Sequence, residues 1–136
     1  MYELESMSME RVIITTTEYG KVILPDIPNE NVWMSEPELV GLFGVIAPTL
    51  RAAVRAVYKS GVLKEYEVQR YVRLENGYYA DVFGFPMIAA LAFRIDSFGA
   101  EQVRNAIFER LYLRKEKTSI FFSLVSNNMD SFNYQA

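Results

Sequence analysis

Histidine and cysteine are both absent from the 136 residues of this chain. Their absence excludes Ser-His-Asp and Cys-His catalytic sites, zinc fingers, haem ligation by histidine and thiolate redox chemistry. No disulfide can form, so the sequence lacks that feature of secreted proteins. We therefore expect a protein that is not an enzyme, with no catalytic residues, no metal site and no cofactor.

Long apolar runs are absent as well. No stretch of 18 apolar residues occurs, and the chain does not begin with basic residues followed by a short apolar segment. We therefore expect no signal peptide, no contact with membranes and a cytoplasmic location. The hydrophobic share of 51% and the charged share of 23% are typical of a globular protein, and the length predicts a single domain over residues 1–136.

The net charge is −3, but the basic residues are unevenly distributed. Six basic and two acidic side chains lie between Arg51 and Arg73, which gives this stretch a net charge of +4. A basic stretch within an acidic protein is either a surface that binds a polyanion or an ordinary solvated helix face. Charge alone does not separate these two interpretations.

The N-terminal part of the sequence predicts a β-hairpin over residues 11–25. The residues from Val12 to Thr17 are all β-branched and favour a strand. Residues 18–21 are typical of a turn, and Val22 to Leu24 would form the returning strand. A loop and a short apolar segment, Val32 to Met34, follow.

The region from Ser35 to Gly61 predicts two consecutive helices. Ser35 and Glu38 have the spacing of a capping box, and Gly44 is suited to end the first helix because it tolerates a positive φ. Pro48 falls in the first turn of the second helix, which Gly61 would end. Two helices joined by three or four residues around a glycine predict a helix-turn-helix, whose second helix enters the DNA major groove.

The second helix carries a basic stripe beside its apolar face. At about 100° per residue, the apolar side chains form one continuous arc, made up of Leu50, Ala53, Val54, Val57 and Tyr58. Arg51, Arg55 and Lys59 occupy a sector of about 80° next to this arc. No acid lies between Leu50 and Lys59. We expect the three cations, together with Thr49, to contact DNA.

Residues 69–84 predict a second hairpin, because Asn76-Gly77 between two strand-like runs is a strong turn signal. We expect a two-residue turn there, with Val72, Leu74 and Val82 on the face toward the helices. A hairpin after a helix-turn-helix is the wing of a winged helix. Arg70 and Arg73 would then lie near phosphates if this wing touches DNA; alternatively, the hairpin only packs on the helices. Its tyrosines, Tyr71, Tyr78 and Tyr79, could instead stack on unpaired bases.

The C-terminal part predicts helices over residues 86–117 and a tail over residues 118–136. The helices would cover Met87 to Phe93 and Gly99 to about Lys117, with Ser97 as an N-cap between them. The run from Ser119 to Val125 fits either helix or strand. The tail contains spare apolar residues, at 120–125 and 132–134, so we expect a homodimer formed through this segment.

The stretch Val-Trp-Met-Ser-Glu-Pro-Glu-Leu-Val-Gly-Leu-Phe-Gly-Val-Ile-Ala-Pro-Thr-Leu, residues 32–50, resembles a pattern of the virulence protein RhuM family. Ser60-Gly61, Arg94-Ile-Asp-Ser97, and Ala100 with Arg104 continue the resemblance, in the same order and at similar spacing, over roughly residues 32–113. The resemblance implies a helix-turn-helix DNA-binding domain of mobile-element or phage type, akin to the phage antirepressor and KilA-N groups.

The sequence departs from that family at the start of the second helix. The family has a polar pair there, often Ser-Arg, where this chain has Ile46 and Ala47. Methyl groups offer no donors or acceptors for reading base pairs. Arg51 matches a family position at which a phosphate contact is plausible.

We therefore predict an α+β fold, a winged helix-turn-helix-like domain with a core at 32–85 that binds duplex DNA. The alternative is a protein–protein interaction module on the same scaffold, with its partner at Ile46 and Ala47 and without sequence-specific reading of DNA.

Overall fold

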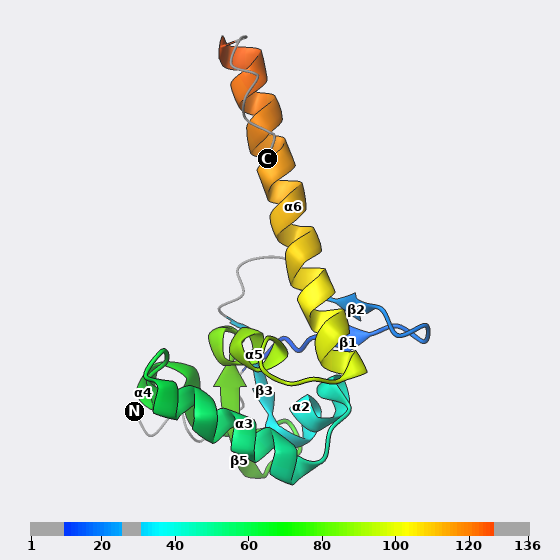
Figure 1. Ribbon diagram of the computed structural model, residues 1–136. Helices are drawn as coiled ribbons and strands as arrows, with labels where there is room; N and C mark the ends of the chain where they lie inside the picture. Colours follow the sequence, from blue (N-terminus) through cyan, green and yellow to red (C-terminus); the bar gives the residue numbers. More distant parts are fainter. Residues whose placement is uncertain (1–9, 26–30, 127–136) are drawn as a thin grey trace. The chain divides into compact units, whose positions relative to one another are not determined.

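The computed structural model describes residues 10–25 and 31–126, and the side chains of these residues as far as residue 112 (Figure 1). The described residues form helices and two small antiparallel sheets, which confirms the predicted α+β class. The chain divides into two compact units, Met1–Arg104 and Asn105–Ala136. The two helices and the hairpin that the sequence predicts to contact DNA all belong to the first unit.

The predicted N-terminal hairpin is present, with shorter strands than the sequence indicates. Strands β1 (Thr15–Thr16) and β2 (Val22–Ile23) pair antiparallel. The N–H of Thr17 donates to the carbonyl of Lys21 at 2.8 Å, and Gly20 closes the turn with a φ of 87°. Nearer the N-terminus the chain leaves this sheet, because Val12 forms a parallel bridge with Val32 instead.

A three-stranded antiparallel sheet forms the centre of the first unit. It consists of β3 (Trp33–Ser35), β4 (Gln69–Arg73) and β5 (Tyr79–Gly84), in the order β3-β5-β4. The sequence did not predict β3 as a strand, because three residues are too short to show the alternation of a strand. Gly84 lies opposite Trp33, and a β-carbon on Gly84 would come within 3.2 Å of the indole. The glycine therefore lets the indole lie close to the strand.

The hairpin of β4 and β5 confirms the predicted hairpin but not its two-residue turn. The N–H of Leu74 donates to the carbonyl of Tyr78, at 2.7 Å, and the N–H of Gly77 donates to the carbonyl of Leu74, at 2.9 Å. The loop is therefore three residues long, Glu75 to Gly77. Gly77, with a φ of 91°, supplies the left-handed residue that such a loop requires.

The strand pairing partly confirms the predicted face of this hairpin. Val72 pairs with Ala80 and Arg70 pairs with Val82, so Val72 and Val82 share one face of the sheet. Val82 is fully buried, whereas Val72 is half-buried.

The described helices are α2 (Glu36–Phe43), α3 (Ala47–Ser60), α4 (Glu65–Val68), α5 (Phe85–Ala92) and α6 (Phe98–Ser126). The short α4 was not predicted. Both predicted helix ends at glycine are confirmed, since Gly44 has a φ of 67° and Gly61 a φ of 83°. The capping box of Ser35 and Glu38 is also present, with the Ser35 N–H donating to Glu38 Oε1 at 2.8 Å.

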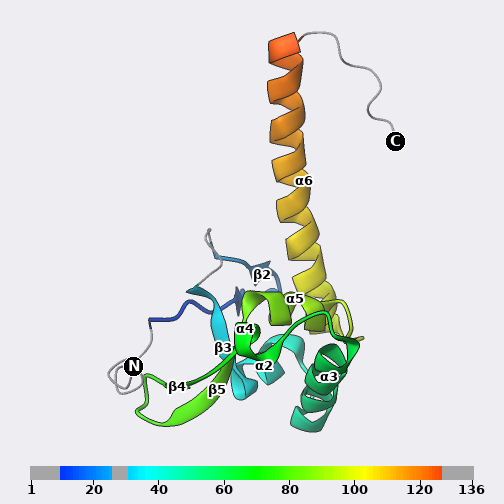
Figure 2. The same cartoon turned by 90° about the vertical axis from the view of Figure 1, so that its left-hand side faces the viewer.

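The core of the first unit lies where α2, α3, α5 and the sheet meet (Figure 2). Helix α2 contacts α3 as well as β3 and β5, and α5 contacts both α3 and β5. The largest fully buried side chains in this region include Phe43, Met34, Leu39, Leu50, Met87, Ile88 and Leu91. Phe93, the C-cap of α5, lies outside this core and is half-exposed.

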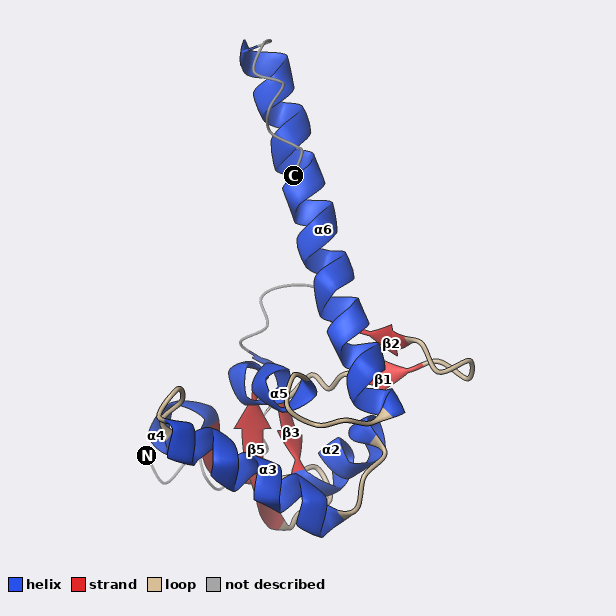
Figure 3. Cartoon of the chain, viewed as in Figure 1, coloured by secondary structure: helices blue, strands red, loops and turns tan. Residues whose placement is uncertain are grey.

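Helix α6 corrects the predicted tail. It continues to Ser126, so residues 118–126 are helical, and the strand alternative for Ser119 to Val125 is wrong (Figure 3). Residues 127–136 lie outside the described part of the chain. Ser97 caps the start of α6 as predicted, because its hydroxyl accepts from the N–H of Ala100 at 3.0 Å and donates to the carbonyl of Phe43 at 2.7 Å.

Among the described residues, no single helix has both the length and the apolar composition to cross a bilayer. One bent pair, α2 with α3, meets the criteria of length and composition when the two helices are taken together.

Candidate nucleic-acid interface

The two helices singled out by the sequence are joined by a three-residue turn. Gly44, Val45 and Ile46 separate α2 from α3, and the chain direction changes by 103° between the helices. The carbonyl of Val40 accepts from the N–H groups of both Gly44, at 2.9 Å, and Val45, at 3.3 Å. Since only a residue that tolerates a left-handed backbone suits the position of Gly44, this glycine fixes where α2 ends.

Helix α3 has the predicted division into an apolar face and a basic face. Leu50, Ala53 and Val57 are buried, and Val54 and Tyr58 are half-buried. The predicted contact residues on α3 are all exposed: Thr49, Arg51, Arg55 and Lys59. The structure therefore brings the three cations together on one open surface, which we call the α3 basic stripe. Contact between this stripe and DNA remains a prediction.

Arg51 already has an acidic neighbour, which the sequence did not indicate. Its Nη2 lies 2.9 Å from Glu36 Oε2, at the first residue of α2. The two side chains are 58% and 33% exposed, so the pair is solvated and contributes little to stability. This ion pair holds the Arg51 guanidinium at the surface, where a phosphate could compete with Glu36 for it.

No acidic side chain in the first turn of α3 offsets the positive end of its helix dipole. The N-cap is Ile46, whose side chain accepts no hydrogen bond, and the first turn contains no acid. Uncapped N–H groups and the positive end of the helix dipole favour an anion at such a terminus. Ile46 itself is 67% exposed, which is unusual for an isoleucine and marks this turn as an apolar surface.

The predicted wing arginines do not extend the α3 basic stripe directly. Figure 2 shows the turn between β4 and β5 and helix α3 at opposite sides of the first unit. The Arg70 guanidinium lies over the Trp33 ring, 4.3 Å from its centroid, in a cation–π contact. Arg73 extends instead toward the hairpin turn, where its Nη2 would lie 3.9 Å from a β-carbon placed on Gly77. Of the two arginines, Arg73 is therefore the one placed near the turn of the β4–β5 hairpin.

Two tyrosines of the β4–β5 hairpin contact one another. The rings of Tyr71 and Tyr79 stack across the strands, with centroids 5.6 Å apart and planes inclined by 24°. Tyr71 also lies directly opposite Asp81 in the strand register, so a carboxylate shares this face. A cross-strand aromatic pair stabilises the hairpin by itself, and it accounts for these two tyrosines without a ligand.

Arg11 connects the β4–β5 hairpin to the start of α2, a role that no local sequence pattern indicates. Its guanidinium donates to both Glu38 oxygens, at 2.7 and 3.0 Å, to Glu75 Oε1 at 2.8 Å and to the Trp33 carbonyl at 2.7 Å. The Arg11 side chain is only 4% exposed. Because Glu75 belongs to the turn of the β4–β5 hairpin and Glu38 to α2, one buried cation holds this hairpin against α2.

These contacts change the proton affinities of the carboxylates. Burial raises the pKa of Glu38, but the hydrogen bonds from Arg11 and from the Ser35 N–H outweigh this effect and hold the pKa below its usual value. The hydrogen bond from Arg11 also lowers the pKa of Glu75. Both carboxylates therefore remain charged at neutral pH, as pairing with Arg11 requires.

Tyr58 connects α3 to the sheet. Its hydroxyl donates to Gln69 Oε1 at 2.7 Å, at the first residue of β4. Burial, with smaller effects from the charges of Glu65 and Asp81, raises the pKa of Tyr58 to about 12. The sequence placed Tyr58 in the apolar arc of α3 but gave no indication of this bond.

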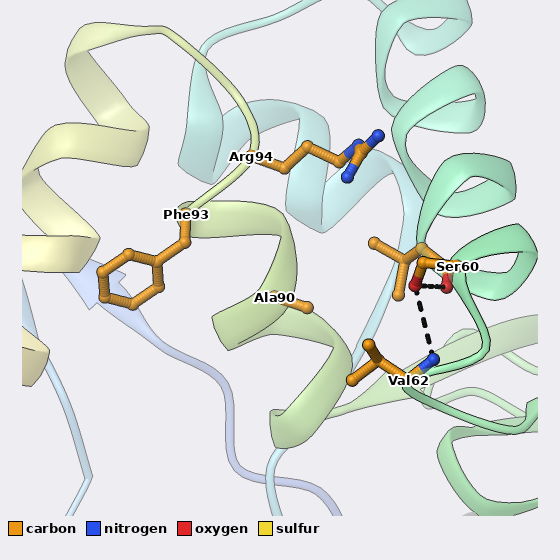
Figure 4. Close-up of a pocket in the computed structure, with 6 residues that line it drawn as sticks. Ser60, Val62, Ala90, Phe93 and Arg94 are labelled. Carbon is orange, nitrogen blue, oxygen red and sulfur yellow. Dashed lines mark hydrogen bonds between the residues drawn. The ribbon is translucent and has the colours of Figure 1, made fainter.

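A groove of about 610 Å³ lies along the other flank of α3, next to α5. Val57, Ser60, Val62, Ala90, Phe93 and Arg94 line it. In Figure 4, the Arg94 guanidinium reaches from the end of α5 toward α3, whereas the Phe93 ring points the other way. Arg94 is thus an exposed cation near α3 that lies away from the α3 basic stripe.

The described residues contain no group of three or more acidic, histidine or cysteine side chains that could hold a metal ion. Comparisons with protein-family models, with curated proteins and with solved structures found no match to this chain. The candidate interface is the bent helix pair with its α3 basic stripe.

Proposed function

We propose that this chain is a DNA-binding or regulatory module of mobile-element or phage type, which contacts duplex DNA through α2 and α3. In this proposal the fold is a winged helix-turn-helix of the RhuM kind, and the protein acts in the cytoplasm. The turn of three residues and the angle of 103° between the helices support it, because a helix-turn-helix joins two helices at about 90–120° through a short turn that often contains glycine.

The single observation that carries the proposal is the α3 basic stripe. Arg51, Arg55 and Lys59 are exposed along one side of the second helix, and the helix has no acid of its own. An ordinary solvated helix face commonly mixes both signs of charge. A row of one sign beside the buried face is suited to follow a phosphate backbone.

The N-terminus of α3 supplies a second phosphate contact. Its first turn lacks both an acid and a side-chain cap, and Thr49 adds an exposed hydroxyl there. In this mode Arg51 leaves Glu36 for a phosphate, while Arg55 and Lys59 follow the same strand. Arg70, over Trp33, and Arg73, at the β4–β5 turn on the other side of the first unit, lie outside this contact.

This mode of binding tolerates different DNA sequences. Phosphate contacts position a protein on the duplex but carry no sequence information directly. The residues at the front of α3, Ile46 and Ala47, present only methyl groups, which can at most touch a thymine methyl. We therefore expect similar affinities for unrelated duplexes.

The experiment is a fluorescence anisotropy titration of the full chain against a labelled random duplex at several salt concentrations. A dimer that places three cations per protomer on phosphates gives a slope of log K against log salt of roughly −5, and a monomer gives about half of that. The double variant Arg51→Gln/Arg55→Gln should reduce the dimer slope to about −2 on every duplex.

The matched control is Arg94→Gln, which removes an exposed arginine on the other flank of α3. It should leave both the affinity and the slope unchanged. Wild-type protein without salt-dependent affinity for any duplex at low ionic strength would refute the proposal.

The second candidate is an interaction module whose partner is a protein. The exposed Ile46, at the turn between the two helices, favours it, because a large apolar side chain at the tip of a helix pair is suited to a protein interface. For this candidate, Ile46→Ser would abolish partner binding and Arg51→Gln/Arg55→Gln would not. The reverse pattern supports DNA binding.

A further inference from the structure

We propose that Asn76 is a site of spontaneous deamidation, and that the contact between Glu75 and Arg11 controls its rate. Asn76 lies in the three-residue loop between β4 and β5, where both it and Gly77 are exposed. These two residues form the only Asn-Gly pair in the sequence. The inference does not depend on the proposal that the chain binds DNA.

The side chain of Asn76 and the main chain of Gly77 supply the two reacting groups. A base from the solvent removes the proton of the Gly77 nitrogen, which attacks Cγ of Asn76. The new N–Cγ bond forms as the Cγ–Nδ2 bond breaks, and the amide group takes up a proton and leaves as ammonia. Water then opens the resulting succinimide ring. Opening at Cγ leaves aspartate, whereas opening at the main-chain carbonyl leaves isoaspartate, and neither route needs an oxidant or a reductant.

Glycine after the asparagine leaves the attacking nitrogen accessible. A β-carbon on the following residue crowds this nitrogen, and glycine has none. The other asparagines in the described part of the chain, Asn31 and Asn105, precede a valine and an alanine. Among the described asparagines, the reaction therefore favours Asn76.

The folded turn holds both reacting groups in other contacts. The Gly77 N–H donates to the carbonyl of Leu74 at 2.9 Å, and Asn76 Oδ1 accepts from the N–H of Tyr78, also at 2.9 Å. The first bond must break before the Gly77 nitrogen can lose its proton, which raises the barrier to attack. Ring closure therefore requires the turn to open, and exposed loops open at a lower free energy than the core.

Arg11 restrains this opening. Its Nη2 and Nε lie 2.8 and 3.3 Å from the two carboxylate oxygens of Glu75, the residue next to Asn76. The Arg11 guanidinium is held in turn, since it is buried and also binds Glu38 and the Trp33 carbonyl. One cation thus attaches the turn to the rest of the first unit, and its loss should let the turn open more often.

The isoaspartate product changes the turn irreversibly. Its main chain runs through Cβ and Cγ of residue 76, which adds a carbon atom to the loop. Two hydrogen bonds close this loop, from Gly77 to Leu74 and from Leu74 to Tyr78, and both depend on its length. The aspartate product keeps the original main chain and an oxygen that can accept from the Tyr78 N–H.

The test incubates the full chain at mildly alkaline pH, with and without urea, and follows the tryptic peptide of residues 74–94 by liquid chromatography and mass spectrometry. We expect its aspartate and isoaspartate forms to accumulate, and to do so faster in urea, because the unfolded chain lacks both protecting hydrogen bonds. A sample digested at the start corrects for reaction during digestion. The internal control is Asn105, in the tryptic peptide of residues 105–110, which should react far more slowly. Asn76 that reacts no faster than Asn105, or equally fast with and without urea, overturns the proposal.

Variants test the control by Arg11. Arg11→Met should raise the rate without urea about fivefold, because an ion pair with one solvated partner contributes up to about that factor, and should leave the rate in urea unchanged. The matched control is Arg55→Met, at an exposed arginine of α3, which should change neither rate.

A second variant breaks the same contact from the other side. Glu75→Gln leaves the pair of Arg11 with Glu38 in place, so it tests the turn even if Arg11→Met does not fold. Because Glu75 is next to Asn76, its effect is measured as the ratio of the rates without and with urea, which should rise about fivefold. A ratio equal to that of wild type overturns the proposal.

Discussion

The guanidinium of Arg11 binds both carboxylate oxygens of Glu38, at 2.7 and 3.0 Å, across 27 residues of sequence. The same Glu38 oxygen that accepts from Arg11 at 2.7 Å also accepts from the Ser35 N–H at 2.8 Å. The carboxylate that caps α2 is thus also the counter-ion of a buried arginine. A single side chain thereby orients the helix start and anchors the segment before β1.

We expect Arg11→Met to destabilise the fold by about 2–3 kcal/mol, because it leaves a half-buried carboxylate without its cation. Urea denaturation followed by circular dichroism measures the change. The control is Arg55→Met on the exposed side of α3, which should change stability by less than about 0.5 kcal/mol. Equal effects of the two variants would contradict the structural role of Arg11.

The lowered pKa of Glu38 predicts how the stability of the fold changes with pH in the acidic range. A carboxyl whose pKa is lower in the folded than in the unfolded protein stabilises the fold above its ordinary pKa of 4.5, and this contribution is lost as the pH falls further. Glu38→Gln should therefore be less stable than wild type at pH 7, with a difference that shrinks toward pH 3. A difference that stays constant over this range would show that Glu38 acts only through packing.

The raised pKa of Tyr58 predicts that the fold loses stability at alkaline pH. Its pKa rises from 10.0 to about 12 on folding, so the folded state holds the phenolic proton more tightly. Stability should fall as the pH rises through this range, and Tyr58→Phe should reduce that fall. At neutral pH the same variant should lose roughly 1 kcal/mol with the bond to Gln69. The control is Tyr66→Phe, at an exposed tyrosine.

Gly99→Ala tests the junction of α2 with α6. A β-carbon there would overlap backbone atoms of Leu42 and Phe43, which cannot move aside as a flexible side chain can. We expect a loss of more than about 2 kcal/mol in thermal or urea unfolding. Wild-type stability of this variant would mean that the two helices lie further apart than described.

The sequence predicts self-association through the apolar residues at 120–125 and 132–134, and exposed apolar side chains in the middle of α6 extend this prediction. Phe108, Leu111 and Tyr112 lie on one face of that helix, at spacings of three and four residues, and each is more than half exposed. We expect a homodimer in sedimentation velocity at micromolar concentrations, and Leu111→Glu should yield a monomer. A wild-type chain that sediments as a monomer removes this prediction and halves the expected salt slope for DNA.

The sequence by itself determined the elements whose signals are local. The capping box of Ser35 and Glu38, together with the glycines at 44 and 61, predicts both ends of α2 and the end of α3, because caps and left-handed positions depend only on neighbouring residues. The apolar arc of α3 follows from helical periodicity, so the exposure of Arg51, Arg55 and Lys59 could be predicted as well.

The tertiary structure decided everything that depends on partners distant in the chain. Strand β3 is too short to show a pattern and exists only because β5 pairs with it. The ion pairs of Arg11 with Glu75 and of Arg51 with Glu36 join residues that no local spacing relates. The groove beside α3 likewise exists only because residues of α3 and α5 meet. Propensity and capping act within a few residues, whereas burial and ion pairing depend on which surfaces the folded chain brings together.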